Sequence, residues 1–184
     1  HPARVDSGVV FVSHVRGRPV EIPARPDQVS STALATSLGR GEARVSTVEH
    51  LLAAFYGLGI DNVRVELQGP ELPIMDGSAA SFAYLVQTAG VFEQRAMRRV
   101  LRVRRPIEIV DGRKRIRVEP SRSFRVSYAI DFAHPAIRKQ SIHGLEITPE
   151  SFERDLARAR TFGFLHEVQA LWRAGLARGG SLEN

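Results

Sequence analysis

Short segments in which apolar and polar residues alternate predict strands in the first third of the chain. Residues 7–22 show two such segments joined by a turn near Gly17, and Gly39 and Gly41 mark a second turn. Residues 62–67 repeat the alternation and predict a half-buried strand. The inward positions expected in the first two strands are Val9, Phe11 and Val20.

Between these strands, residues 46–62 carry the longer period of an amphipathic helix. Its apolar stripe consists of Val48, Leu51, Leu52 and Phe55. His50 lies roughly 200° round the helix from Val48, so its imidazole is not expected to face the core of that helix. Ala53 and Ala54 flank His50 and leave space beside it for a ligand, a metal or another element.

Glu49, the neighbour of His50, has a structural and a chemical interpretation. Ser46-x-x-Glu49 has the pattern of a capping box, in which each side chain accepts a hydrogen bond from a backbone amide of the other residue. A carboxylate in this position can also act as a general base. The two interpretations are compatible, because the first turn of a helix can hold a residue that serves both purposes.

The first half of the chain is expected to end with a helix, and the second half to begin with a hairpin. Ser78 can cap a helix that ends at Gly90. Asp111-Gly112 is a favoured pair for a hairpin turn, and residues 123–132 are expected to continue the same sheet.

A longer helical segment is predicted at residues 148–175. Thr148 can serve as its N-cap, Pro149 suits its first helical position, and Gly163 interrupts it. The order of elements predicts an α+β fold with two similar units, residues 1–95 and 96–184, each a sheet against a layer of helices.

Composition supports a globular protein, with 43% hydrophobic and 25% charged residues among 184. No segment approaches the roughly 18 apolar residues of a membrane span, so we do not expect stable membrane insertion. We expect a cytoplasmic location. The absence of cysteine means that a transition metal would need histidine and carboxylate ligands. His50 is a candidate ligand, but no H-E-x-x-H, G-x-S-x-G, P-loop or dinucleotide motif accompanies it.

The net charge of +6 is concentrated in a basic run at residues 95–120. Such a run can bind nucleic acid or another anionic partner, which leaves a non-catalytic basic module as the alternative function. The run also alternates with Val103 and Ile116 at strand period, as a solvated strand face would. It contains no aromatic residue on which a base could stack, which favours the solvated face.

Five separated motifs carry a family resemblance along essentially the whole chain. They are STVEHLLAAFYGLGIDNVRVEL, GPELPIMDGSAASF, IDFAHPAI, ARTFGF and GGSLEN, in that order. Together they resemble the UDP-3-O-acyl-N-acetylglucosamine deacetylases, zinc amidohydrolases of lipid A synthesis in Gram-negative bacteria. The resemblance implies two α+β domains, each a sheet against a pair of helices, that pack face to face with the active site at their junction.

The resemblance also implies roles for particular residues. Glu49 corresponds to the general base, His50 to a Zn²⁺ ligand, and Thr161 to the residue that stabilises the tetrahedral oxyanion. Phe132 and Phe162 correspond to substrate-contacting positions. The candidates for lining the passage of the acyl chain are Leu165, Val168, Ala177, Ser181 and Leu182. The implied substrate is a small anionic UDP-sugar, and the full-length protein is expected to be a monomer that binds no nucleic acid.

The chain also departs from the family pattern. The G-V-G-L-H-S-G strand, the H-K-x-x-D element with the other two zinc ligands, and a later histidine proposed as general acid are absent. We therefore expect a fragment of an active enzyme, with both units incomplete, that binds zinc weakly and is inactive alone. An inert truncated product that folds poorly is the remaining alternative.

Overall fold

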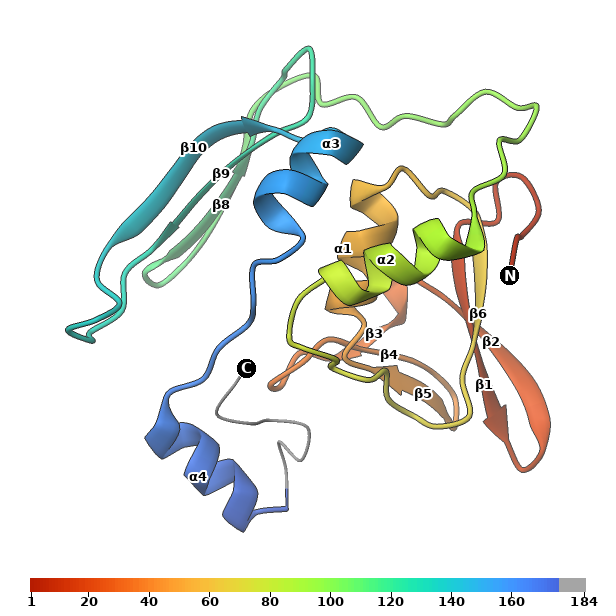
Figure 1. The fold of residues 1–184 in the computed structure, drawn as a ribbon, viewed down its shortest axis with the longest axis horizontal. Helices are drawn as coiled ribbons and strands as arrows, with labels where there is room; N and C mark the ends of the chain where they lie inside the picture. The colour runs from red at the N-terminus through yellow and green to blue at the C-terminus, as the bar shows by residue number, and fades with distance from the viewer. Residues whose placement is uncertain (176–184) are drawn as a thin grey trace.

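The chain has an α+β fold, as predicted, in a computed structural model that describes residues 1–175 (Figure 1). Strands and two helices make up the first half, and a group of strands followed by short helical segments makes up the second. The division into units at residues 95–99 stays a prediction. Residues 90–106 contain no helix or strand and connect the two halves.

The first sheet has the strand order β2-β1-β6 and contains the predicted hairpin. Its strands are β1 (Val9–Val15), β2 (Arg18–Pro23) and β6 (Val63–Glu66). Arg16 and Gly17 both have positive φ, at 50° and 76°, as a two-residue turn between twisted strands requires. Phe11 is fully buried, whereas Val9 and Val20 are half-buried against the core. The predicted inward side of the hairpin is therefore confirmed.

A second sheet with the order β3-β4-β5 contacts the first. Its strands are β3 (Val29–Ser31), β4 (Ser37–Arg40) and β5 (Ala43–Ser46), and the short helix η1 (Pro26–Gln28) precedes them. Gly41 has φ 61° in the tight turn between β4 and β5, whereas Gly39 lies within β4.

Helices α1 (Glu49–Gly57) and α2 (Ala80–Ala89) pack on each other and cover the two sheets (Figure 1). The core lies between the sheets and these helices. The predicted stripe of α1 supplies Val48, Leu51 and Phe55, all buried, with Leu52 half-buried. Gly90 ends α2 with φ 80°, as predicted. The hydroxyl of Ser78 accepts a hydrogen bond from the amide of Ala80, although Ser78 lies one residue before the N-cap.

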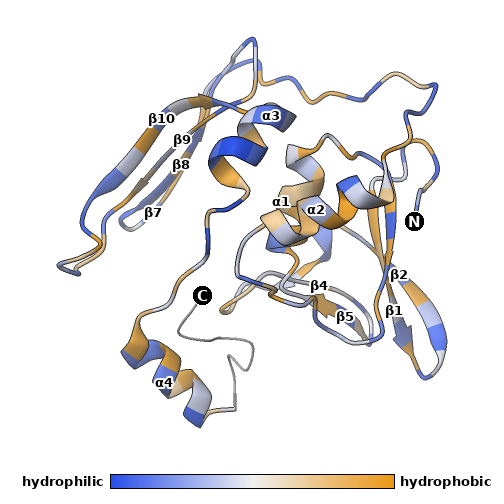
Figure 2. Cartoon of the chain, in the orientation of Figure 1, coloured by the Kyte–Doolittle hydropathy of each residue, from blue (hydrophilic) through white to orange (hydrophobic). Residues whose placement is uncertain are grey.

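The second half forms two separate two-stranded sheets rather than one continuous sheet. Strands β7 (Ile107–Asp111) and β8 (Lys114–Val118) form the predicted hairpin, with Gly112 at φ 56° in its turn. Strands β9 (Arg125–Ile130) and β10 (Gln140–Glu146) pair with each other, so the prediction that residues 123–132 continue the hairpin sheet is wrong. Every residue of β7 and β8 is exposed, and Figure 2 shows hydrophobic and hydrophilic residues mixed along β7–β10.

The predicted helix at residues 148–175 is divided into separate segments. Helix α3 (Pro149–Ser151) begins at the predicted N-cap Thr148 and continues as the π-helical turn η2 (Phe152–Leu156). The chain is not helical from residue 158 to residue 164, and α4 (Leu165–Arg173) follows. The interruption predicted at Gly163 is therefore confirmed, but it extends over residues 158–164, which bond to the first half of the molecule through Thr161.

Phe152 and Ala157 belong to the same buried cluster as the core of the first half. They are 6% and 3% exposed. The segment of α3 and η2 thereby fixes the second half of the chain against α1.

Candidate functional site

The turn before α1 is held by a left-handed threonine. Thr47 has φ 60°, a conformation that is rare for a β-branched residue, and it is 8% exposed. Its amide donates to the carbonyl of Thr36 at 3.1 Å, and its hydroxyl donates to a carboxylate oxygen of Glu71 at 2.7 Å. These bonds fix the direction in which α1, with Glu49 and His50 in its first turn, leaves the sheet.

Glu49 is exposed at the start of α1, and its carboxylate accepts a hydrogen bond from the amide of Thr36. The predicted capping box is wrong. Ser46 lies in β5, where its hydroxyl bonds the hydroxyl of Ser37 at 2.9 Å, and the N-cap position belongs to Val48. The carboxylate of Glu49 is therefore oriented by Thr36, thirteen residues earlier and just before β4, and not by its own helix.

His50 is half-buried, which agrees with a position off the main core stripe. The predicted alanine face beside it is only partly present. Ala53 is exposed, but Ala54 is fully buried in the core because α1 is covered on both sides of its stripe. Any space beside the imidazole therefore lies on the side of Ala53.

A cavity of about 540 Å³ opens between α1 and the second half of the chain. Glu49 is the charged residue in its lining, and apolar side chains of α1, β9 and η2 make up most of the rest. They include Leu52, Tyr56, Val126, Phe152 and Leu156. The rings of Tyr56 and Phe124 pack edge to face on the same wall, with 5.2 Å between their centroids. A carboxylate beside an apolar cavity can remove a proton from a group that binds there.

Thr161 lies in the non-helical stretch before α4, and its side chain is exposed. Its amide donates to the carbonyl of Gly77 at 2.8 Å, in the turn that leads into α2. Because α2 packs on α1, this bond attaches the Thr161 segment to the helix pair that carries Glu49 and His50. Among residues 1–175 no hydrogen bond or ion pair joins the side chains of these three residues to one another.

The aromatic candidates Phe132 and Phe162 do meet, at 5.4 Å between ring centroids in an edge-to-face arrangement. Phe164 contacts both rings, at 5.7 and 5.8 Å. His134 and His166 lie against Phe164 at 5.2 and 5.9 Å, the latter stacked at 17°. We call these five residues the aromatic cluster. Phe132 and Phe162 are 37% and 48% exposed, so the cluster presents ring surface to solvent.

Sequence reasoning missed three members of the aromatic cluster. The sequence TFGF places Phe162 and Phe164 two residues apart, and an extended chain directs such residues to one side, whereas His166 lies in the first turn of α4. The helix predicted for this stretch hid that signal. His134 follows Asp131 by three residues but in a loop, and His166 has no carboxylate or second histidine three or four residues away, so neither shows the spacing of a helical metal site.

The candidates for the acyl-chain passage fall partly inside the described part of the chain. Leu165 is 54% exposed and Val168 is half-buried, three residues apart on α4. Ala177, Ser181 and Leu182 lie outside the described residues, so all five assignments stay predictions.

A metal site is not complete within residues 1–175. No group of three histidine, aspartate or glutamate side chains in this range could hold a metal ion. His50 thus offers one imidazole, whereas a catalytic zinc ion needs three protein ligands. The described residues do not fit a full zinc site.

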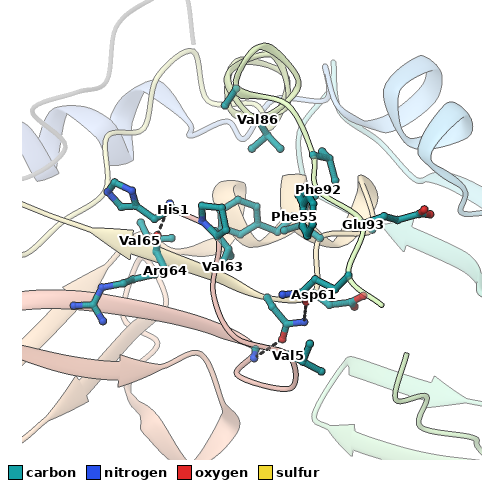
Figure 3. Close-up of a pocket in the computed structure, with 18 of the residues that line it drawn as sticks. His1, Val5, Phe55, Asp61, Val63, Arg64, Val65, Val86, Phe92 and Glu93 are labelled. Atoms are coloured by element: carbon teal, nitrogen blue, oxygen red, sulfur yellow. Dashed lines mark hydrogen bonds between the residues drawn. The ribbon is translucent and has the colours of Figure 1, made fainter. Parts of the chain in front are cut away.

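A larger cavity of about 1190 Å³ lies elsewhere, among α2, β6 and the first residues of the chain (Figure 3). Its walls include Phe55, Val63, Val65, Val86 and Phe92. Glu49, His50 and Thr161 are not in its lining. This cavity is therefore separate from the candidate chemistry.

The basic run of residues 95–120 is partly neutralised by neighbouring acids. Arg115 pairs with Glu108 at 3.7 Å across the β7–β8 hairpin, and Arg117 pairs with Glu119. Arg98 pairs with Asp61 at 2.8 Å. This pattern suits a solvated face, as the sequence favours. Within residues 1–175, no helix has the length and apolar character needed to cross a membrane.

Comparison with known proteins places this chain in a family. A family model described as LpxC, UDP-3-O-acyl N-acetylglycosamine deacetylase, matches residues 1–184. The chain belongs to the LpxC family. A UDP-3-O-acyl-N-acetylglucosamine deacetylase of Myxococcus xanthus is 55% identical over 183 residues, which cover 100% of this chain and 58% of the relative. Another, of Methylococcus capsulatus, is 48% identical over 184 residues and is covered to 60%.

The chain therefore spans about three fifths of the length of these LpxC relatives. The expected family is confirmed. A chain that is shorter than its relatives agrees with the expectation of a fragment.

Proposed function

We propose that the full-length protein is a zinc-dependent deacetylase that removes the acetyl group of UDP-3-O-acyl-N-acetylglucosamine in lipid A synthesis. The observation that carries the proposal is the position of Glu49, whose oriented carboxylate lines the cavity between α1 and the second half of the chain. The match to the LpxC family over the whole chain supports the same reaction. The 184 residues alone are proposed to be inactive.

Glu49 is proposed as the general base. Its carboxylate would take a proton from the water that attacks the acetamide carbonyl carbon, so that the new C–O bond forms as the O–H bond breaks. The hydrogen bond from the Thr36 amide supports this role, because it holds one carboxylate oxygen and leaves the other available. The apolar lining of the cavity supports it too, because it offers the uncharged part of a substrate a surface to pack on beside the carboxylate.

Thr161 is proposed to donate its hydroxyl hydrogen to the oxyanion that forms when the carbonyl is attacked. A hydroxyl aimed at developing charge stabilises the transition state more than the substrate, provided that it is held in place. The amide bond from Thr161 to the carbonyl of Gly77 supports such a placement. Collapse of the tetrahedral intermediate would then break the C–N bond, and the leaving amine would take up a proton as acetate is released.

The aromatic cluster is proposed to bind the nucleotide part of the substrate. The exposed rings of Phe132 and Phe162 offer surfaces on which a uracil base can stack. Phe164 supports both rings from the side. Leu165 and Val168 are proposed to contact the acyl chain, with Ala177, Ser181 and Leu182.

His50 is proposed as one zinc ligand, although the described residues do not supply the other two. We propose that these come from the part of the LpxC relatives that this chain does not span. A zinc ion in such a site would act as a Lewis acid toward the acetamide. We also propose that the full-length protein is a cytoplasmic monomer that binds no nucleic acid.

The direct test is to incubate the full-length protein with UDP-3-O-acyl-N-acetylglucosamine and measure released acetate. The proposal predicts release that a metal chelator stops, and no release by the wild-type protein would refute it. Metal content tests the ligand separately. His50→Ala should lose bound zinc, whereas His14→Ala, on an exposed position of β1, should keep it. Equal zinc content in the two variants would exclude His50 as a ligand.

A further inference from the structure

The turn that receives Thr161 is built around one carboxylate. Asp76 lies between Met75 and Gly77, whose φ angles of 55° and 79° are both left-handed. Its Oδ1 accepts from the hydroxyl of Ser78 at 2.8 Å, from the amide of Ser78 at 3.3 Å and from the hydroxyl of Ser81 at 3.2 Å. Ser78 is fully buried, so these bonds connect the turn rigidly to the start of α2.

The same turn contacts the Thr161 segment at two points. The carbonyl of Gly77 accepts the amide of Thr161 at 2.8 Å. The other oxygen of Asp76, Oδ2, lies 3.9 Å from Nε of Arg160. Two consecutive residues of the turn thus face two consecutive residues of the segment, which defines both its position and its direction.

The hydrogen bonds to Asp76 also favour its ionised form. The bonds from Ser78, with a smaller contribution from Ser81, lower the pKa of the carboxyl against the opposing effect of desolvation. The carboxylate is therefore charged near neutral pH and able to accept all three hydrogen bonds. The left-handed backbone on both sides of Asp76 costs free energy, and the hydrogen bonds to its carboxylate offset that cost.

We propose that Asp76 is a positioning residue for Thr161: by fixing the turn that presents the Gly77 carbonyl and by facing Arg160, it sets the place of the Thr161 hydroxyl. The catalytic part of this inference depends on the proposed function, because it assigns Thr161 a role in the deacetylation. The structural part does not, because it concerns only how the segment of residues 158–162 is held.

The structural part is tested by hydrogen exchange in the full-length protein. Asp76→Ala removes the acceptor of all three bonds and should abolish the protection of the Thr161 amide. Asp76→Asn keeps an amide oxygen at the same place and should retain most of that protection. Unchanged exchange at Thr161 in Asp76→Ala would overturn the inference, whatever the activity of the protein.

The catalytic part is tested by kinetics with the UDP-sugar substrate. Asp76→Ala should lower kcat by roughly tenfold to 100-fold with little change in KM, because a displaced hydroxyl loses its effect on the transition state. Asp76→Asn should recover most of kcat. In the Thr161→Ala background, Asp76→Ala should cause no further loss, whereas independent effects would multiply. Multiplied losses, or an unchanged kcat in Asp76→Ala, would reject the positioning role.

Two further variants separate a specific effect of Asp76 from a general effect on the fold. Asp27→Asn removes a carboxylate paired with Arg25 on the surface of the first half and should change neither exchange at Thr161 nor kcat. Where Asp76→Ala does not fold, Ser81→Ala removes one of the three bonds and should lower kcat several-fold, and an unchanged kcat there would overturn the inference. Absence of deacetylation by the wild-type protein refutes the proposed function while the exchange result still decides the structural part.

Discussion

The ring of Phe152 lies directly against Gly57 of α1, so that a Cβ atom at Gly57 would come within 3.0 Å of three ring carbons. Phe152 belongs to the turn η2 and is 6% exposed in the shared core. A glycine inside a helix costs stability, and here it permits the second half of the chain to approach α1 closely. This contact forms one wall of the cavity that Glu49 lines.

Gly57→Ala is expected to destabilise the full-length protein by about 1–3 kcal/mol through overpacking, although alanine is the better helix former. Gly69→Ala is the matched control, because a Cβ there meets nothing within 4 Å, and it should cost less than about 0.5 kcal/mol. Urea unfolding measures both. In the Phe152→Ala background the Gly57→Ala substitution should no longer destabilise, and an equal loss in both backgrounds would disprove the contact.

The hydroxyl of Thr47 is expected to stabilise the turn before α1. Thr47→Val removes its 2.7 Å bond to the carboxylate of Glu71 and should cost about 1.5–3 kcal/mol, the range for hydrogen bonds to charged groups. Thr47→Ser keeps a hydroxyl and should cost less. Thermal unfolding of the two variants provides the comparison, and equal losses would mean that the methyl group, not the hydrogen bond, matters there.

The lowered pKa of Asp76 predicts a dependence of stability on pH. The folded-state pKa lies below the usual value of 3.8, mainly because of the hydrogen bonds from Ser78, so ionised Asp76 stabilises the fold above that value. This stabilisation is lost as pH falls through the lower, folded-state pKa. The wild-type protein should therefore exceed Asp76→Asn in unfolding free energy at about pH 7, and the difference should shrink in acid. A difference that grows on acidification would contradict the assignment.

The aromatic cluster is expected to bind the uracil base. Phe132→Ala in the full-length protein should weaken UDP binding by about 1–3 kcal/mol, the usual value of stacking one base on an aromatic side chain. Phe92→Ala is the control, because Phe92 is 79% exposed and lines the other cavity. Calorimetric titration with UDP measures both. Equal affinities in the two variants would place the nucleotide elsewhere.

Local chemistry in the sequence was enough to predict the turns. Gly17, Gly90 and Gly112 lie where a left-handed residue is needed, and Thr148 caps α3 as its sequence suggests. These predictions succeed because each depends on neighbours only a few residues away. The α+β class followed from the order of the elements.

Long-range contacts explain the failures. The carboxylate of Glu49 bonds Thr36, thirteen residues earlier, so the local capping pattern with Ser46 has no effect. Gly163 predicts a break in the helix, but the longer non-helical stretch of residues 158–164 goes with the bond between Thr161 and Gly77, which is distant in sequence. The roles of Glu49, His50 and Thr161 came from the family resemblance and stay predictions, as do the boundaries of the two units.

The central claim is that Glu49 is the base of a deacetylase, and Glu49→Gln in the full-length protein tests it most directly. The amide oxygen of glutamine can still accept the bond from Thr36, so the unfolding free energy should stay within about 0.5 kcal/mol of the wild-type value. Zinc content should also be unchanged. We predict that kcat for acetate release falls by about 10²–10⁴-fold. A folded, zinc-loaded Glu49→Gln protein that releases acetate at the wild-type rate would contradict the account.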